Sequence, residues 1–469
     1  MTNPKLFFLL GASLLSHPFH GFSESLSAEK STKRPNFVII LCDDLGYGDL
    51  GTFGHPTIKT PNLDKMASEG QKWTSFYAAS SVCTPSRAGL MTGRYPIRSG
   101  MCSDKNLVLF PDSKGGLPAS EITIAEALKS GGYVTACIGK WHLGDKEQYL
   151  PNNNGFDYYY GIPYSNDMDR APGTSYEEAC KLARIEDFNP PVIRNNKIIE
   201  RPAQQNKLTK RYTDEAIKFI TENKKKSFFL YLAHSFPHVP LFRSEEFVGK
   251  SKRGLYGDVI EELDWSVGEI LSMLKDNGLD KNTLIVFTSD NGPWLTFNEF
   301  GGSAGLLRDG KGSTYEGGMR VPTIFWWPNH LHNSVVSDIG STLDLFPTFC
   351  SLAGVKLPDD RIYDGKDLTN SLLYGKPSPI NELIYYRGQK IYAARKGAYK
   401  AHFFTKPAYG DEEEQFHEIP LLYNLETDPS EKFDISKENS KIILEIIKMV
   451  EEHKKTVIHV KDQLEERGD

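Results

Sequence analysis

Short hydrophobic runs recur along the first three quarters of the chain, and stretches with helical periodicity separate them. The runs are rich in β-branched and aromatic residues, which is typical of buried strands. The predicted strands are Phe37–Leu41, Val134–Ile138, Phe228–Ala233, Leu284–Thr288 and Thr323–Trp327. The predicted helices are Leu63–Glu69, Ile122–Ser130, Tyr212–Asn223 and Val259–Asn277. This alternation predicts an α/β fold, in which a large, mostly parallel sheet is flanked by helices on both faces.

The pattern changes near the Gly- and Pro-containing stretch that begins at Gly375, after which strand-like sequence dominates. The runs LIYYRG, KIYAARKGAYKAHFFT and LLYNLE predict a small antiparallel sheet. Apolar residues at helical spacing between Ile442 and Val450 then predict a helix that packs against this sheet. We therefore expect a catalytic α/β domain over 28–376 and a smaller subdomain over 377–469.

The first residues have the pattern of a signal peptide. Lys5 precedes an apolar stretch, Leu6 to Leu15, that is too short to span a bilayer. Small residues at Ser25 and Ser27 predict cleavage near Ala28, so residues 1–27 form the signal peptide. Because no other segment approaches transmembrane length, we expect an exported protein, periplasmic or secreted, with no stable membrane insertion.

Charge and cysteine content exclude several classes of protein. The net charge is −6 and is spread along the chain, so no basic face predicts a nucleic-acid partner. The six cysteines form no CxxC pair and no zinc-type spacing, and they are too sparse for a disulfide scaffold. Cys42, Cys137 and Cys350 lie in apolar runs, where a cysteine is usually a small buried hydrophobic residue.

Two of the predicted strands end in acidic turns. Asp43 and Asp44 follow the first strand, and Asp290 and Asn291 follow the strand at Leu284–Thr288. Ligands collect at the carboxyl ends of parallel strands, and an all-oxygen set of this kind suits a hard divalent cation such as Ca²⁺. Each pair alone is also compatible with ordinary turn or capping chemistry.

One cysteine stands apart from the others. Cys83 lies in the polar run SSVCTPSRAGLMTGR, just ahead of helix-forming sequence that begins near Arg87. A lone cysteine is usually an inert core residue. However, the motif C-x-P-x-R followed by GxxTGR resembles the type I sulfatases of the alkaline phosphatase superfamily. In that family, the cysteine of this motif is oxidised to formylglycine by a maturing enzyme that acts on the unfolded chain during export.

Further motifs follow in the order of that family. They are PNFVIILCDDLGYGDLG at 35–51, GKWHLG at 139–144, HSFPHVPLF at 234–242, TSDNG at 288–292, GKGSTYEGGMRVP at 310–322 and LYNLETDPSE at 422–431. The strings GIPYSND and GLLRDGKGSTYEGG are most similar to the arylsulfatase A and N-acetylgalactosamine-6-sulfatase branch. The resemblance implies an alkaline-phosphatase-like fold and hydrolysis of sulfate esters, with a sulfated sugar or an aryl sulfate as substrate.

The resemblance also implies a role for each matching residue. Asp43, Asp44, Asp290, Asn291 and Cys83 as formylglycine would bind one Ca²⁺. One hydroxyl of the formylglycine hydrate, deprotonated towards Asp290, would attack sulfur and give a sulfated enzyme. His238 would protonate the leaving alcohol, and His142 would accept the proton of the second hydroxyl as sulfate leaves. The remaining residues would hold the sulfate group or the hydrate: Lys140, Lys311, Ser165 and Arg87.

Several readings stay open for these residues. His234 lies only four residues before His238 and competes with it for the role of acid. Asn166 stands where the arylsulfatase A pattern has histidine, which puts the substrate contacts of that loop in doubt. Residues in expected loops beside the motifs suit a sugar better than an apolar aryl group: Tyr159, Tyr160, Asp167, Asp169, Arg170, Trp294, Phe297 and Arg308.

Two other functions are compatible with parts of the pattern. A phosphodiesterase or phosphonate monoester hydrolase of the same superfamily often uses an unmodified Thr or Ser and two transition-metal ions, and the motifs here supply no second His/Asp cluster. A non-catalytic protein that binds sulfated glycans would not need the Cys-Thr-Pro-Ser-Arg string. The sulfatase reading is therefore the principal prediction.

Overall fold

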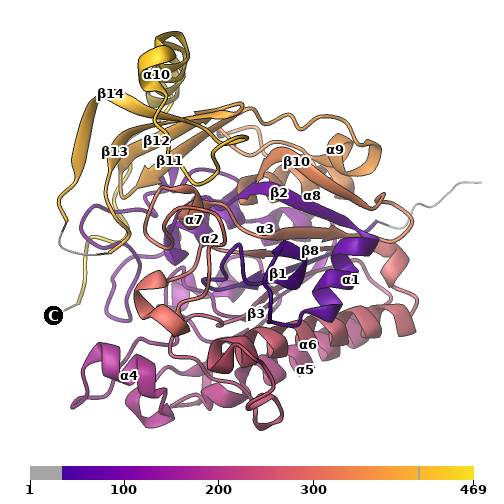
Figure 1. Ribbon diagram of the computed structural model, residues 1–469. Helices are drawn as coiled ribbons and strands as arrows, with labels where there is room; N and C mark the ends of the chain where they lie inside the picture. Colours follow the sequence, from indigo (N-terminus) through magenta and orange to yellow (C-terminus); the bar gives the residue numbers. More distant parts are fainter. Residues whose placement is uncertain (1–33, 410–411, 469) are drawn as a thin grey trace, which may run out of the picture. The chain divides into compact units, whose positions relative to one another are not determined.

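A ten-stranded sheet organises the larger part of the chain, and the computed structural model describes residues 34–409 and 412–468 (Figure 1). The predicted signal peptide lies outside these residues. The strand order is β10-β2-β9-β8-β1-β7-β3-β4-β5-β6, and only β9 and β5 run antiparallel to both of their neighbours. The predicted α/β class with a mostly parallel sheet is confirmed. The bounds are β1 Asn36–Cys42, β2 Gln71–Tyr77, β3 Val134–Gly139, β4 Tyr158–Gly161, β5 Val192–Arg194, β6 Lys197–Glu200, β7 Phe228–Ala233, β8 Thr283–Ser289, β9 Thr323–Trp326 and β10 Ser334–Ser341.

Helices cover both faces of this sheet because the central strands are apolar on both sides. In β1, Val38 and Ile40 belong to one hydrophobic cluster, whereas Phe37 and Ile39 belong to another. The first cluster includes residues of α1 (Pro61–Glu69), α5 (Leu208–Asn223) and α6 (Gly254–Asp276). The second includes residues of α2 (Cys83–Thr92), α3 (Ile124–Ser130) and α8 (Leu345–Ala353). The remaining α-helices of the described residues are α4 (Tyr176–Leu182), α7 (Glu316–Met319), α9 (Thr369–Tyr374) and α10 (Ser440–Lys455).

Element boundaries differ from the predictions where local chemistry overrides periodicity. Helix α3 begins after Thr123, because this side chain forms a capping box with Glu126. Helix α2 begins at Cys83 rather than near Arg87. Pro85 does not prevent this earlier start, because the first backbone N–H groups of a helix have no intrahelical partner to lose.

The second sheet is antiparallel, as predicted, with the order β11-β12-β13-β14. Its strands are β11 Glu382–Arg387, β12 Lys390–Lys396, β13 Tyr399–Thr405 and β14 Gln415–Asn424. Helix α10 packs on it through Ile443, Ile446 and Val450. These three residues belong to the apolar stripe that the sequence predicts for a terminal helix.

A buried ionic cluster connects this small sheet to the large one. Lys400 of β13 donates hydrogen bonds to Glu316 of α7 at 2.9 Å and lies 3.1 Å from Glu431. Glu431 also contacts His402 at 2.7 Å and accepts a hydrogen bond from the backbone N–H of Glu316 at 2.7 Å. All four side chains are fully buried. Because α7 follows Lys311 in sequence, the small sheet supports a loop that reaches the candidate site.

Within the described residues, no helix is both long and apolar enough to cross a bilayer. The six cysteines all fall inside this part of the chain, and each is free and buried. The interpretation of Cys42, Cys137 and Cys350 as buried hydrophobic residues is therefore confirmed.

Candidate active site

Four adjacent strands deliver polar residues to one edge of the large sheet. In the order β8-β1-β7-β3, the residues that follow these strands include Asp290, Asp43, His238 and Lys140. The strands are parallel to one another, so their carboxyl ends meet at the same edge. Helix α2 brings Cys83 to the same place.

Three buried carboxylates and one buried amide form the centre of the site. Oxygen atoms of Asp43, Asp44 and Asp290 lie within 4.8 Å of one another. The Asp44 backbone N–H donates to Asp290 Oδ1 at 3.2 Å, and Asn291 Nδ2 donates to Asp44 Oδ1 at 2.7 Å. Asp44 has a φ of 64°, an unusual left-handed conformation for a non-glycine residue. The turn that presents the two acids is therefore held in a sparsely populated conformation.

This donor set fits a hard divalent cation. Asn291 Oδ1 is buried and has no hydrogen-bond partner among the described residues. Oxygen-only donors in a buried acidic cluster are the chemistry that Ca²⁺ prefers. Burial and then Asp43 raise the pKa of Asp290 to about 7, and a cation beside this carboxyl would favour its ionised form. The four residues predicted to bind Ca²⁺ are thus brought together.

Three buried cationic side chains surround the carboxylates. Lys140 Nζ lies 2.5 Å from Asp43 Oδ2, and Lys311 Nζ lies 2.7 Å from Asp44 Oδ2. Arg87 donates from Nε to Asp290 at 2.9 Å and from NH1 to the carbonyl of Lys140 at 2.7 Å. Burial opposes ionisation of Asp43, but Lys140, His238 and Arg87 outweigh it and hold the pKa of Asp43 well below its usual range. This ring of positive charge suits an anionic substrate.

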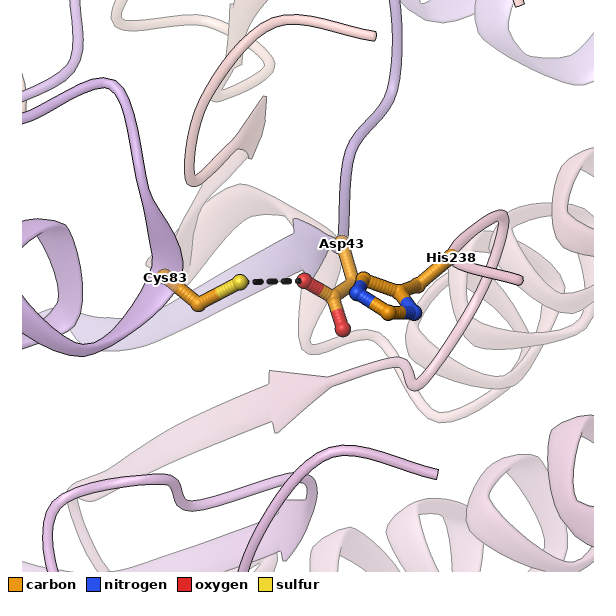
Figure 2. Close-up of side chains that lie close together, drawn as sticks. All are labelled: Asp43, Cys83 and His238. Carbon is orange, nitrogen blue, oxygen red and sulfur yellow. Dashed lines mark hydrogen bonds between the residues drawn. The ribbon is translucent and has the colours of Figure 1, made fainter. Parts of the chain in front are cut away.

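Cys83 is the first residue of α2 and points at the acid cluster. Its Sγ lies 3.4 Å from Asp43 Oδ1, and Figure 2 shows the thiol on one side of Asp43 and His238 beside the same carboxylate. The side chain is buried, with 1% exposure. Burial and then Asp43 raise the pKa of the Cys83 thiol well above its usual value, so an unmodified cysteine is a poor nucleophile here.

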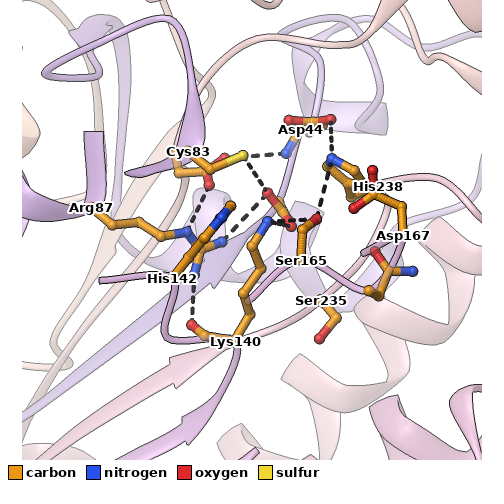
Figure 3. A network of polar contacts seen from close by, with 12 residues as sticks. Asp44, Cys83, Arg87, Lys140, His142, Ser165, Asp167, Ser235 and His238 are labelled. Atoms are coloured by element: carbon orange, nitrogen blue, oxygen red, sulfur yellow. Dashed lines mark hydrogen bonds and ion pairs between the residues drawn. The ribbon is translucent and has the colours of Figure 1, made fainter. Parts of the chain in front are cut away.

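Two histidines enter the cluster from different strands (Figure 3). His238 lies 3.5 Å from Asp44 Oδ2 and 3.5 Å from Ser165 Oγ through Nε2, while its Nδ1 donates to the carbonyl of Val239 at 2.5 Å. Ser165 also accepts a hydrogen bond from Lys140 at 3.1 Å. Burial and then Lys311 lower the pKa of His238, whereas the neighbouring carboxylates of Asp44 and Asp167 act in the opposite direction.

His142 is oriented differently. Its Nε2 donates to the backbone carbonyl of Leu109 at 2.9 Å, because that carbonyl can only accept. Its Nδ1 is buried and has no partner among the described residues. Burial and then Lys140 lower the pKa of His142 well below its usual value. The free Nδ1 lone pair is therefore available to accept a proton.

His234 lies away from this cluster. Its Nε2 contacts Ser266 at 3.3 Å, and its ring lies 6.3 Å from that of Tyr212 beneath the sheet edge. Burial alone lowers its pKa to about 3. Of the two histidines in the HSFPHVPLF motif, His238 is the one that reaches the candidate site.

A cavity of about 610 Å³ opens onto Cys83, His142, Ser165, His238 and Lys311. Of the eight loop residues expected beside the motifs, the cavity is lined by Asp167, Asp169, Arg170 and Trp294. Tyr159 and Tyr160 lie instead in β4, and Arg308 stacks on Tyr315 outside the cavity. Tyr409 and Tyr176 line the cavity but belong to no motif, and only the tertiary fold brings them there.

Asn166, which stands where the arylsulfatase A pattern has histidine, is held by hydrogen bonds within the protein. It donates to Gln205 at 3.0 Å and to the carbonyl of Pro240 at 3.1 Å, and Gln205 donates back to its carbonyl. These hydrogen bonds connect the loop that carries Asn166 to Gln205 and Pro240. Its neighbours Ser165 and Asp167 face the cavity.

A mostly parallel sheet that presents buried acids, buried lysines and a single nucleophile-type position at one edge is the arrangement of an ester hydrolase for anionic substrates. The Sulfatase family model matches residues 35–355, and a model of the C-terminal region of aryl-sulfatase matches residues 378–468. The chain belongs to the sulfatase family.

Curated relatives and solved structures agree with this assignment. Arylsulfatase A from Homo sapiens is 41% identical over 428 residues, which cover 86% of this chain and 83% of that protein. N-acetylgalactosamine-6-sulfatase from Mus musculus is 40% identical over an alignment that covers 94% of this chain and 90% of that protein. The crystal structure of Ps i-CgsB in complex with k-i-k-neocarrahexaose has a TM-score of 0.77 and 32% sequence identity. The match covers 91% of this chain and 94% of that chain. The protein is therefore a sulfuric ester hydrolase.

Proposed function

We propose that the protein hydrolyses sulfate esters of carbohydrates, with residue 83 acting as formylglycine and one Ca²⁺ held by Asp43, Asp44, Asp290 and Asn291. The observation that carries this proposal is the position of Cys83. It is the first residue of the C-x-P-x-R string, and its side chain contacts the acid cluster and lines the cavity. The carbohydrate substrate is supported by a relative named for N-acetylgalactosamine and a similar structure that holds a neocarrahexaose.

The nucleophile is a hydroxyl of the formylglycine hydrate at position 83. Asp290 accepts its proton, in keeping with the family resemblance, and Asp43, the closest carboxylate to the Cys83 thiol, orients the side chain. Arg87 fixes Asp290 through a 2.9 Å contact. When bound, the cation adds positive charge beside the sulfate oxygens and favours the ionised hydroxyl.

Sulfate is held by the residues that now neutralise the acids. Lys140 and Lys311 point into the cluster from opposite loops, and Ser165 bridges Lys140 and His238. Two buried ammonium groups and a hydroxyl can stabilise the charge that develops on the non-bridging oxygens. Trp294 lies over the Lys311 ammonium at 4.2 Å and limits its exposure to water.

The two histidines transfer protons at different stages. His238 Nε2 faces the cavity, and a bound sulfate anion raises its pKa, so this nitrogen can protonate the leaving oxygen. His142 accepts the proton of the second hydroxyl at its free Nδ1, which releases sulfate from the sulfated-enzyme intermediate and restores the aldehyde.

A single metal site also separates this proposal from a two-metal phosphodiesterase. Among the described residues, the groups of metal-binding side chains overlap at Asp43, and no second, separate cluster occurs. The acid, base and nucleophile positions are all present around one cavity, which a protein that only binds sulfated glycans would not need.

We further propose that the chain is exported to the periplasm or secreted, and that a formylglycine-generating or sulfatase-maturing enzyme modifies it on the way. The segment that carries the export signal lies outside the described residues. The modification is supported by the Cys83-Thr84-Pro85-Ser86-Arg87 string, which the family's maturing enzymes read.

Mass spectrometry tests the proposed nucleophile directly. In protein made together with a maturing enzyme, the peptide around Cys83 should be about 18 Da lighter than the thiol form, as conversion of the side chain to an aldehyde requires. Cys83→Ala should abolish turnover while the circular dichroism spectrum stays unchanged. Full activity in protein whose residue 83 is entirely thiol would overturn the proposed mechanism.

A further inference from the structure

Asp167 is a cavity residue that the proposed chemistry does not use. It follows Ser165 by two residues and lines the same cavity as Cys83 and His238 (Figure 3). The hydroxyl of Tyr176 donates to its Oδ2 at 2.6 Å. Its Oδ1 is buried and has no hydrogen-bond partner among the described residues. An enclosed carboxylate oxygen without a donor is unfavourable, so this atom points to a donor on the ligand.

The carboxylate is ionised and lines the same cavity as His238, the proposed proton donor. Burial opposes ionisation, but His238 and the Tyr176 hydroxyl outweigh it and lower the pKa of Asp167. An ionised carboxylate can only accept hydrogen bonds. Because His238 is the proposed donor to the leaving oxygen, the group that reaches Asp167 belongs to the leaving alcohol rather than to the sulfate.

An aromatic wall stands beside this carboxylate. The Trp294 ring lies 5.3 Å from that of His238 and 5.2 Å from that of Tyr409. The Tyr176 ring, which holds Asp167, lies 6.4 Å from Trp294. Binding sites that combine aromatic walls with a few polar groups suit ligands that have an apolar face and an edge of hydroxyl groups.

We propose that Asp167, Tyr176 and Trp294 form a subsite for a pyranose leaving group. The sugar ring lies against Trp294, and the hydroxyl next to the sulfate ester donates to Asp167 Oδ1. Asp167 is thus a specificity-determining residue that favours sugars with a free hydroxyl beside the ester. The inference rests on the proposed function, because the place of His238 at the leaving oxygen fixes where the sugar lies.

The subsite predicts discrimination between close analogues. A sugar that lacks this hydroxyl leaves Asp167 Oδ1 buried and unpaired, which is the situation in which a binding site rejects an analogue most strongly. A second sulfate group in place of this neighbouring hydroxyl would face the Asp167 carboxylate and would be repelled. An aryl sulfate has no such hydroxyl, so it gains nothing from Asp167.

The test compares three substrates on the mature, calcium-loaded enzyme: a pyranose sulfate with a free neighbouring hydroxyl, its deoxy analogue at that carbon, and 4-nitrophenyl sulfate. For the wild type, kcat/KM should be about 10- to 100-fold higher for the hydroxyl substrate than for the deoxy analogue, the size expected for a hydrogen bond to a charged group. Asp167→Ala should remove most of this ratio and change 4-nitrophenyl sulfate turnover far less.

Asp169→Asn is the matched control. Asp169 lines the same cavity, but its Oδ2 already lies 3.3 Å from both Asn189 and Arg201. This variant should keep the discrimination against the deoxy analogue. Asp167→Asn, which preserves the size of the side chain, serves the test if Asp167→Ala fails to fold.

Two results would overturn the subsite. The first is a wild type that hydrolyses both sugars equally well. The second is an Asp167→Ala enzyme that loses activity on all three substrates alike and keeps the wild-type ratio, because Asp167 would then act only through His238. A wild type with no activity on any sulfate ester would instead overturn the proposed function, and the subsite with it.

Discussion

The two histidines of the site differ in which ring nitrogen is free. His142 uses Nε2 for the Leu109 carbonyl and keeps Nδ1 unpaired, whereas His238 uses Nδ1 for the Val239 carbonyl and turns Nε2 towards Asp44 and Ser165. Backbone carbonyls therefore fix the tautomer of each neutral ring. This difference gives each histidine one usable nitrogen and supports two separate proton-transfer roles.

Replacing His238 should separate substrates by leaving group. A sugar alkoxide needs a proton as the S–O bond breaks, whereas nitrophenolate leaves readily without one. We expect His238→Ala to reduce kcat on sugar sulfates by about 10²- to 10⁴-fold, and to reduce turnover of 4-nitrophenyl sulfate much less. Steady-state kinetics on the two substrates checks this. Equal losses on both would contradict the role of general acid.

Replacing His142 should not separate the substrates by leaving group. In the proposed mechanism His142 acts after the alcohol has left, so His142→Ala should slow the hydrolysis of both substrates by the same factor. The enzyme should release a burst of alcohol and accumulate a covalent adduct of about +80 Da on residue 83. Intact mass spectrometry after mixing detects it. His234→Ala is the control, since the buried His234 ring contacts Ser266 and should trap no adduct.

The proposed calcium site should respond in a graded way to loss of its ligands. Asn291→Ala removes a neutral oxygen donor, so Ca²⁺ affinity should fall by at least about tenfold and excess Ca²⁺ should restore activity. Asp290→Ala should not be rescued, because it also removes the partner of the buried Arg87. Calcium titrations followed by thermal unfolding measure both. Unchanged affinity in Asn291→Ala would remove this residue from the site.

At the level of elements, the strands that carry the site were predictable because they are buried on both faces and read as continuous apolar runs. β2 and β10 were not predicted. β2 (QKWTSFY) has neither a continuous apolar run nor a regular alternation, and β10 (SVVSDIGS) is an edge strand with exposed residues, including Val335 at 66%. The pairing of β2 with β10 and with β9 depends on contacts between segments far apart in sequence.

The motifs similarly predicted the residues at strand ends, but not those of the cavity wall. Asp43, Lys140, His238 and Asp290 follow strands and match family motifs, so their meeting could be expected. Tyr409 follows β13 of the small sheet, and Tyr176 begins α4; only tertiary packing brings either ring to Trp294. No local periodicity encodes such a contact.

The end of β3 depends on a close approach between backbones. Gly139, just before Lys140, has a φ of 112°, and a Cβ there would lie 1.8 Å from the carbonyl oxygen of Ala233. Gly139→Ala must therefore separate β3 from β7, and we expect a loss of about 1–3 kcal/mol of stability together with most of kcat. Chemical denaturation and kinetics measure the two effects.

Gly132 offers a matched control for this variant. It precedes the same strand and has a φ of 85°, but a Cβ there would meet nothing within 4 Å. Gly132→Ala should lose stability through backbone strain alone and keep kcat. Equal losses of kcat in the two variants would show that the approach of β3 to β7 does not position Lys140.

At the scale of the whole molecule, Lys400 is the centre of the ionic cluster that connects the two sheets. Lys400→Met would leave Glu316 and Glu431 buried with less compensation, which should cost about 3–5 kcal/mol in the free energy of unfolding. Lys454→Met is the control, because the Lys454–Glu451 pair is exposed and should contribute little. Denaturant titrations of both variants would show the difference.

The same cluster should make the protein sensitive to acid. Burial opposes ionisation of Glu316, but Lys400, Arg320 and Arg395 outweigh it and lower its pKa; Lys400 likewise lowers the pKa of Glu431. Carboxyls with lowered pKa values stabilise the fold above their unfolded pKa of about 4.5, and this stabilisation is lost as pH falls. Stability should therefore fall from pH 6 to pH 3 more steeply in the wild type than in Lys400→Met.

The burial of Cys83 has a consequence for timing. With 1% of the residue exposed, at the bottom of a cavity and at the start of a packed helix, the thiol is out of reach of another enzyme once the chain has folded. Under the proposed maturation, the modification of Cys83 must therefore precede the folding of each newly made chain. A chain that folds first would keep the unmodified Cys83 thiol. The specific activity of a preparation would then report the fraction of chains in which residue 83 was modified before folding.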